Sequence, residues 1–358
     1  MHYNFQYDFS HINNQVLNVY LVLDNNTLGR NIMQNSIHRI TLFFLLLLLI
    51  IFPACGKNRI DTDRNTDLTE LKITQTHESL LYLPLYLAID LDFFKEEGLS
   101  ILLETSASKE KALQNLLAAN TSLLIGSPVS AFYHLQQENA EHLVFLAQAA
   151  SKSGYYLLAR NSTTPFSWQD LKGKNVIGHT TGELSQIIFE YLLRKNNLQP
   201  ILNVHIIQNL PLHLVEGAFL SGTGHYVLAT EPQASLIEKK ANSHVAAVID
   251  LSSENIVTEV IMTTPEFRDN NPLICQSFVN GYQKGLTWLN EHSPEEIVDA
   301  GKKFFPTEND LVLLRAISRY KTMGCWPFST NIDSQGLQKL QDIMLESKEI
   351  NSLYLFEK

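Results

Sequence analysis

The sequence has few cysteines, a deficit of positive charge and no motif of a known catalytic site. It contains 3 cysteines in 358 residues, which leaves no cysteine cluster. Lys and Arg number 27 against 37 Asp and Glu, and the resulting net charge of −10 argues against nucleic acid and against a basic membrane-binding patch. The expected partners are therefore small molecules and protein.

Motifs for catalysis and nucleotide binding are also missing. Gly222-Thr223-Gly224 lacks the third glycine of a dinucleotide fingerprint, and the chain has no Walker A loop, His-Glu-x-x-His helix or Gly-x-Ser-x-Gly elbow. The 12 histidines are scattered, so a surface or core role is expected for each. No metal and no cofactor are implied, which favours a binding protein over an enzyme.

An apolar run near the start resembles the core of a signal peptide. It extends from Leu42 to Phe52, follows Arg39, and ends in Pro53-Ala54-Cys55-Gly56. A membrane-spanning helix needs roughly 20 residues, whereas a secretory apolar region has about 7–15 with a small residue before the cleavage site. The alternative is a short buried helix, but the run has no polar face. We expect residues 1–54 to be removed and Cys55 to carry a lipid that holds the protein at a membrane.

The residues around this run define the rest of the predicted export segment. Residues 1–32 are rich in Asn and aromatics, unlike a signal sequence, so we expect translation to start at Met33. Residues 55–68 are polar and aperiodic after the lipidated cysteine, which is typical of a flexible tether. In the oxidising compartment that this implies, Cys275 and Cys325 either form a disulfide or, as the apolar helical pattern around Cys275 favours, remain buried thiols.

From Leu71 the chain alternates short apolar strands with amphipathic helices, the pattern of parallel α/β sheets. We assign residues 69–152 and 246–358 to one lobe and residues 153–245 to a second. The predicted strands are Leu71–Thr76, Leu99–Leu103, Ser122–Ile125, Asn175–Gly178, Val204–Ile207 and Tyr226–Ala229. The apolar stretches Leu143–Ala150 and Tyr155–Ala159 are interpreted as the crossing into the second lobe, and Val245–Leu251 and Val257–Thr263 are expected to return the chain to the first lobe.

The predicted helices have clear boundary signals. Gly98 is placed to end the helix Pro84–Glu96. Ser127-Pro128 is placed to begin the helix that follows the strand Ser122–Ile125. Ser293-Pro294-Glu295-Glu296 forms a capping box in the C-terminal helical region. The other helices are predicted at Lys109–Ala118, Glu183–Lys195, Leu212–Leu220, Pro232–Lys240 and Pro272–Asn290, with two more starting at Thr307 and Ser334.

Ligands of open α/β sheets bind at the carboxyl ends of strands, beside helix N-termini. Three such strand ends carry polar groups and are our candidate binding segments. The candidate residues are Gln75, His77 and Glu78 after the first strand, Ser127 after the third, and Thr180, Thr181, Gly182, Glu183 and Ser185 in the second lobe. The alternative for the last segment is a capping box of Thr180 and Glu183 without a ligand.

Two further positions are candidates for the cleft. Glu231 follows the strand Tyr226–Ala229, where its carboxylate can accept a hydrogen bond from an amine or ring N–H; the alternative is a solvated loop residue. Tyr155 and Tyr156 lie at the expected crossing between lobes, where one ring lines the cleft and the other packs in a core. The sequence does not decide which.

Several stretches resemble the substrate-binding proteins of the nitrate, sulfonate and taurine importer group. The resemblance spans about Leu71–Ile350. It rests on Pro84-Leu85-Tyr86-Leu87-Ala88, Phe93-Phe94-Lys95-Glu96-Glu97-Gly98-Leu99, Leu171-Lys172-Gly173-Lys174, Ala218-Phe219-Leu220-Ser221-Gly222, Glu231-Pro232 and the helix from Asn271-Pro272 to Trp288-Leu289-Asn290. His225 departs from it, because relatives commonly have Asp before the tyrosine.

The resemblance implies a periplasmic-binding-protein type II fold, with two α/β lobes joined by two crossover strands and a helical C-terminal region. It also implies an extracytoplasmic, monomeric receptor that delivers a small organic solute, such as a sulfonate or pyrimidine, to an ABC permease and its ATPase. The alternatives are an enzyme of the same fold, a thiamine-pyrimidine synthase that uses a cysteine-rich motif, and a sensory receptor partner.

Overall fold

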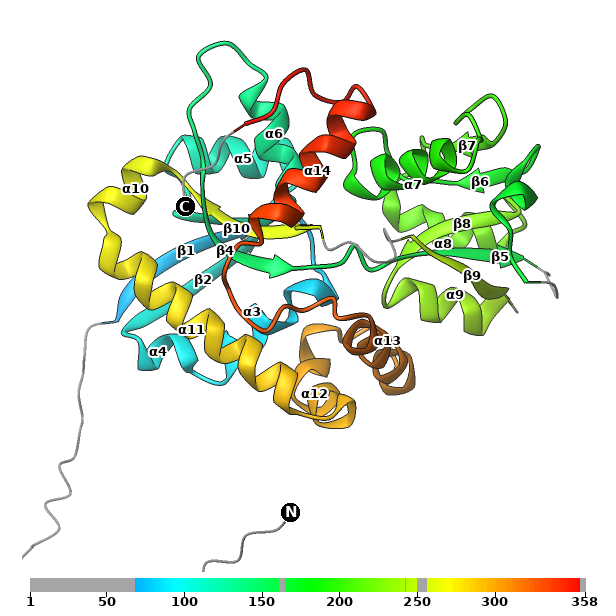
Figure 1. Ribbon diagram of the computed structural model, residues 1–358. Coiled ribbons are helices and arrows are strands. Elements are labelled where there is room, and N and C mark those ends of the chain that lie inside the picture. Colours follow the sequence, from blue (N-terminus) through cyan, green and yellow to red (C-terminus); the bar gives the residue numbers. More distant parts are fainter. Residues whose placement is uncertain (1–67, 161–164, 242, 250–255, 355–358) are drawn as a thin grey trace, which may run out of the picture. The chain divides into compact units, whose positions relative to one another are not determined.

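The computed structural model describes residues 68–160, 165–241, 243–249 and 256–354. The predicted signal segment, Cys55 and almost all of the tether lie outside these ranges. Among the helices described, none is long and apolar enough to cross a membrane. The strands form two separate five-stranded sheets, so the predicted two-lobed α/β architecture is confirmed (Figure 1).

The first sheet has the strand order β2-β1-β3-β10-β4. Strand β10 is antiparallel to both of its neighbours, whereas β1 pairs in parallel with β2 and β3. All four residues of β3 are buried, as expected for a strand covered on both faces. The bounds are β1 Thr69–Gln75, β2 Leu99–Thr105, β3 Leu123–Gly126, β4 Val144–Ala150 and β10 Glu259–Thr263.

The second sheet repeats this topology in the order β7-β6-β8-β5-β9. Here β5 is the antiparallel strand, paired with β8 and β9, while β6 is parallel to β7 and β8. The bounds are β5 Tyr155–Arg160, β6 Asn175–Ile177, β7 His205–Ile207, β8 Tyr226–Thr230 and β9 Ser243–Ile249.

The chain passes from the first sheet to the second between β4 and β5, and it returns between β9 and β10 (Figure 1). Our expectation that Val245–Leu251 returns the chain to the first lobe is wrong, because its described residues, 245–249, belong to strand β9, which pairs with β5. The predicted lobe boundary at residue 245 therefore falls inside a strand of the second sheet. Sequence pattern could not show this, because an apolar strand reads alike in either sheet.

Most helices follow a strand of one sheet or of the other in the chain. Those that follow strands of the first sheet are η1 Leu80–Tyr82, α3 Leu83–Asp90, α4 Phe93–Glu96, α5 Lys109–Leu117, α6 Val129–Leu135, α10 Pro265–Asn270, α11 Pro272–Glu291, α12 Pro294–Gly301 and η3 Lys302–Phe304. Those that follow strands of the second are η2 Trp168–Leu171, α7 Leu184–Lys195, α8 Leu212–Leu220 and α9 Gln233–Ala241. The Ser293–Glu296 capping box is present as predicted.

Two predicted helix boundaries are corrected by the backbone. The expected helix Pro84–Glu96 is broken into α3 and α4, because Asp92 adopts a left-handed conformation with φ of 62°. Gly98, with φ of 79°, follows α4 as expected for a terminating glycine. Helix α6 begins after Pro128, so Ser127 lies one residue further out than a side-chain cap requires.

The C-terminal region contacts both lobes. It contains α13 Asp310–Met323 and α14 Ser334–Glu346. Arg319 of α13 pairs with Glu231 of the second lobe, and Ser347 accepts a hydrogen bond from Arg194 of α7. Cys275 and Cys325 are both buried thiols, which confirms the simpler of the two sequence interpretations.

Candidate functional site

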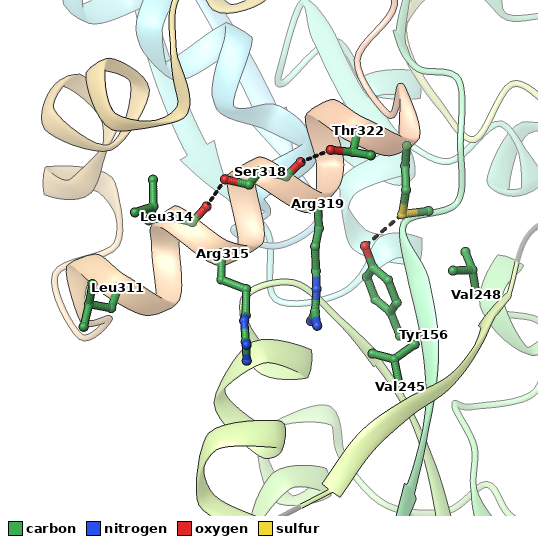
Figure 2. Close-up of a pocket in the computed structure, with 10 residues that line it drawn as sticks. Tyr156, Val245, Val248, Leu311, Leu314, Arg315, Ser318, Arg319 and Thr322 are labelled. Atoms are coloured by element: carbon green, nitrogen blue, oxygen red, sulfur yellow. Dashed lines mark hydrogen bonds between the residues drawn. The ribbon is translucent and has the colours of Figure 1, made fainter. Parts of the chain in front are cut away.

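One large cavity lies between α13 and the strands β5 and β9 (Figure 2). Its volume is about 590 Å³ and its wall is mainly apolar, with Leu314 and Val248 among its residues. The hydroxyl groups of Ser318 and Thr322 donate to carbonyl oxygens of their own helix, at 2.6 and 2.8 Å. Figure 2 shows these bonds lying along the helix, so neither hydroxyl has a hydrogen left to donate to a guest molecule.

A second cavity, of about 650 Å³, lies between the two lobes and is lined by polar groups from both. It brings together the residues after β1, the start of α5, the loop before α7 and the end of β8. These are the carboxyl ends of strands and the N-termini of helices, where α/β folds bind ligands. Because polar side chains of two lobes converge here, we take this cleft as the candidate binding site.

Most of the residues predicted from the sequence meet in this cleft. His77, Glu78, Tyr155, Thr180, Glu183, Ser185 and Glu231 all line it. Thr181 and Gly182 instead line an adjacent cavity of about 430 Å³ formed with α5 and α6. Gln75 and Ser127 are not among the residues lining either cavity.

The side chain of Gln75 is buried and makes its hydrogen bonds within the protein. It is 4% exposed, accepts a hydrogen bond from Tyr86 at 2.7 Å and donates to Thr105 at 2.9 Å. The hydroxyl of Ser127 accepts a bond from the amide of Val129 at 3.4 Å, which holds the turn into α6. The structure thus gives both side chains contacts within the protein.

Glu231 lies in the cleft wall, but the protein itself occupies its carboxylate. One oxygen accepts a bond from Arg319 at 3.0 Å, and the other accepts from the backbone amide of Ser235 at 3.0 Å. The side chain is fully buried. This arrangement corrects the alternative of a solvated loop glutamate, because Glu231 is a buried partner of α13.

The loop before α7 differs from the predicted capping box. The residue that precedes the helix is Glu183, and no side chain caps it. Glu183 instead forms an ion pair with Lys109 of α5, with 2.7 Å between Oε1 and Nζ. His179 and Ser185 are joined by a hydrogen bond between Nδ1 and Oγ. The box is absent because α7 begins at Leu184, which leaves Thr180 three residues before the N-cap position.

The two tyrosines at the crossing take different roles. Tyr155 lines the cleft, and its ring meets His179 edge-on at 5.9 Å between centroids. Tyr156 is 3% exposed and lies in the wall of the α13 cavity, where its hydroxyl approaches the sulfur of Met323 (Figure 2). Side chains alternate across a strand, so neighbouring residues must face opposite ways.

Sequence reasoning missed Glu259, the second buried acid in the cleft lining after Glu231. It is 5% exposed, lies at the start of β10, and accepts a hydrogen bond from Tyr82 at 3.0 Å. Burial raises its pKa to about 8, opposed by the bond from Tyr82 and assisted by the charge of Glu183. A glutamate inside the apolar strand Glu259–Thr263 was the available signal, because such a residue is rarely buried without a role.

The cleft favours the neutral form of its two histidines. Desolvation lowers the pKa of the exposed His77 and of the partly buried His179, opposed in each case by the charge of Glu183. Lys109 is the lysine of this lining, and the lining contains no arginine. Among the described residues, no group of three or more His, Cys, Asp or Glu side chains is placed to hold a metal ion.

His225 lies away from the cleft. Its Nδ1 accepts the backbone N–H of Asn175 at 3.2 Å, and its own amide donates to the carbonyl of Asn175 at 2.8 Å. These bonds hold the starts of β6 and β8 together, at the sheet edge opposite the strand ends that form the site. His225 is not among the residues that line the cleft.

Comparison with known sequences places the chain in a family. The model of the family described as NMT1/THI5 like matches residues 81–297. The candidate binding protein YtlA of Bacillus subtilis (strain 168) is 32% identical over 284 residues, covering 79% of this chain and 85% of YtlA.

Solved structures show the same fold. The periplasmic aliphatic sulphonate binding protein SsuA of Escherichia coli has a TM-score of 0.63 at 14% identity, covering 79% of this chain and 94% of SsuA. The periplasmic nitrate-binding protein NrtA of Synechocystis PCC 6803 has a TM-score of 0.58 at 12% identity, covering 76% and 75% of the two chains. The architecture is the periplasmic-binding-protein type II fold expected from the sequence.

Proposed function

The chain belongs to the NMT1/THI5-like family, and on this premise we propose that it is the solute-binding lipoprotein of an ABC importer. It captures a small organic solute between its lobes and delivers it to a permease driven by an ATPase. The chain binds its solute and does not transform it. The related proteins named above are described as binding proteins, which supports this function.

The observation that carries the proposal is the cleft of about 650 Å³, to which both lobes contribute polar side chains. Two lobes with a cavity between them can close on a guest by a hinge motion. The two connections between the lobes, from β4 to β5 and from β9 to β10, are the places where such a hinge can act. Closure then exchanges solvent in the cleft for protein contacts.

The predicted export segment supports an extracytoplasmic location. The apolar run Leu42–Phe52 and Cys55 are both outside the described residues, so this part of the proposal rests on sequence. Lipid attached at Cys55 would keep the receptor near its permease. The net charge of −10 fits a small-molecule receptor better than a nucleic-acid partner.

Two measurements test the proposal. Ligand-induced thermal stabilisation across a metabolite library should identify a single saturable solute. Fractionation of cells that express the full chain should place it with membranes, and Cys55→Ala should release it. A chain that stays in the cytosol, or that no metabolite stabilises, would contradict the receptor function.

A further inference from the structure

The cleft carries an excess of negative charge. Its lining contains one lysine and six glutamates, which are Glu78, Glu110, Glu183, Glu231, Glu259 and Glu308. Lys109 is paired with Glu183, and Glu231 is paired with Arg319 from α13. Glu259 keeps its proton at neutral pH because burial raises its pKa to about 8. The uncompensated negative charge therefore comes from Glu78, Glu110 and Glu308, and it disfavours an anionic guest.

The helix N-termini that usually attract anions are already occupied by the chain's own acids. Helix α5 begins after Ser108, and its first turn contains Glu110, whose pKa is lowered by its own backbone N–H and the Ser108 hydroxyl. Helix α7 begins directly after Glu183. Negative charge at a helix N-terminus satisfies the positive end of the dipole. A sulfonate or nitrate would have to approach these carboxylates.

Glu259 is the acceptor that a cation would meet at the base of the cleft. One oxygen of the Glu259 carboxyl group, Oε2, accepts a hydrogen bond from the hydroxyl of Tyr82. Among the described residues, no other group donates a hydrogen bond to this side chain. The side chain is 5% exposed and lies in the cleft lining. The other oxygen, Oε1, can therefore accept a hydrogen bond from a guest molecule in the cleft.

Aromatic faces stand beside this acceptor. Tyr155 lines the cleft, and His77 lies 5.7 Å from Tyr82 between ring centroids. The His77 side chain is exposed, but desolvation in the cleft and the charge of Lys109 lower its pKa, which disfavours a positive charge on this ring. The faces of electron-rich rings attract cations.

We propose that the cleft takes a cationic, nitrogen-containing organic solute whose protonated nitrogen binds Glu259, and that it rejects sulfonates and nitrate. This inference rests on the proposed receptor function and specifies the solute class. It separates the chain from the proteins of the same fold that are named for sulphonate and nitrate. The specificity follows from the charge of the lining and not from the fold.

The experiment compares matched probes and the retained solute. Benzylamine and benzamidine are tested against benzenesulfonate, benzoate and nitrate by thermal shift on the full mature chain, and native mass spectrometry identifies any solute that copurifies. We expect the cationic probes to raise the melting temperature and the retained solute to be a protonated base. Glu259→Gln should weaken the cationic probe at least about tenfold. Glu104→Gln, an exposed carboxylate outside the cleft, should leave binding within about twofold.

The outcomes separate the two proposals. Stabilisation by a sulfonate, carboxylate or nitrate, or their copurification, would overturn the cationic class and leave the receptor function standing. Stabilisation by no probe, no library metabolite and no retained solute would overturn both. If Glu259→Gln fails to fold, the charge of the solute held by the wild-type chain still decides.

Discussion

The ammonium group of Lys109, at the start of α5, lies 2.7 Å from a carboxylate oxygen of Glu183, which precedes α7 in the other lobe. Both side chains are about one-third exposed, at 31% and 39%, so the pair contributes about 1 kcal/mol at most. Its importance lies in its position, because it joins the two lobes across the cleft. A weak contact there can bias an open–closed equilibrium without much effect on folding.

Charge reversal tests this contact. Lys109→Glu places two carboxylates face to face, so we expect the ligand-free protein to populate a more open state, with a larger radius of gyration by small-angle X-ray scattering. The double variant Lys109→Glu, Glu183→Lys should restore the wild-type radius while keeping the net charge of the cleft. Lys72 and Glu104 form a matched pair within the first lobe, at 2.9 Å, and reversing Lys72 should leave the radius unchanged.

The ion pair of Arg319 with Glu231 should matter for folding. Glu231 is fully buried, so Arg319→Met leaves a buried carboxylate without its cation and should destabilise the protein by about 3 kcal/mol in urea unfolding. Arg315 is the control on the same helix: it is 55% exposed and contacts Glu238 at 3.3 Å. Arg315→Met should cost no more than about 1 kcal/mol. Equal effects of the two substitutions would contradict a special role for Arg319.

The buried carboxyl group of Glu259 predicts a pH dependence of stability. Its pKa is about 8 in the folded protein against an ordinary value of 4.5, so the folded state holds a proton that the unfolded chain has lost between these values. Ionising the buried carboxyl group destabilises the folded state. The free energy of unfolding should therefore fall as pH rises from 4.5 and level off above about 8. Of the charged groups that act on it, Lys109 favours ionisation and Glu183 opposes it.

Glu259→Gln removes this titration. Between pH 5 and pH 9 the wild-type protein should lose stability relative to the variant, on the order of 1–4 kcal/mol, measured by urea unfolding at each pH. Parallel stability curves for the two proteins would mean that Glu259 is ionised throughout the range.

Close packing of α11 on α3 predicts the effect of two glycine substitutions. A Cβ at Gly285 would clash with the carbonyl oxygen of Pro84, which belongs to backbone and cannot move aside. Gly285→Ala should therefore destabilise by about 2 kcal/mol in thermal unfolding. Gly217 lies in α8 with open space where its Cβ would be, so Gly217→Ala should stabilise by about 0.5–1 kcal/mol. A neutral Gly285→Ala would show that the two helices are not in close contact.

Local sequence signals correctly predicted those helices whose position depends on residues a few places apart in the chain. The apolar spacing of Leu184, Ile187, Ile188 and Tyr191 gave α7, and Ser293 with Glu296 gave the start of α12. The break at Asp92 was missed, because a left-handed residue other than glycine has only a weak sequence signature. The sheet to which β9 belongs was also missed, since pairing between distant strands leaves no local trace.

The candidate site was likewise predictable from the sequence only in part. Strand-end reasoning located His77, Thr180 and Glu183 in one cleft, because the carboxyl ends of parallel strands share one edge of a sheet. It could not assign Glu231 to Arg319, which is 88 residues away along the chain. Nor could it find Glu259, whose role depends on burial beside Tyr82.

The sequence by itself determined the two-lobed α/β class, the order of strands and helices and the region of the cleft, because hydrophobic period and end signals act over a few residues. The tertiary structure alone decided which carboxylates are paired and which remain for a guest. Burial and ion pairing depend on distances between segments far apart in the chain, and those distances exist only once the lobes have folded.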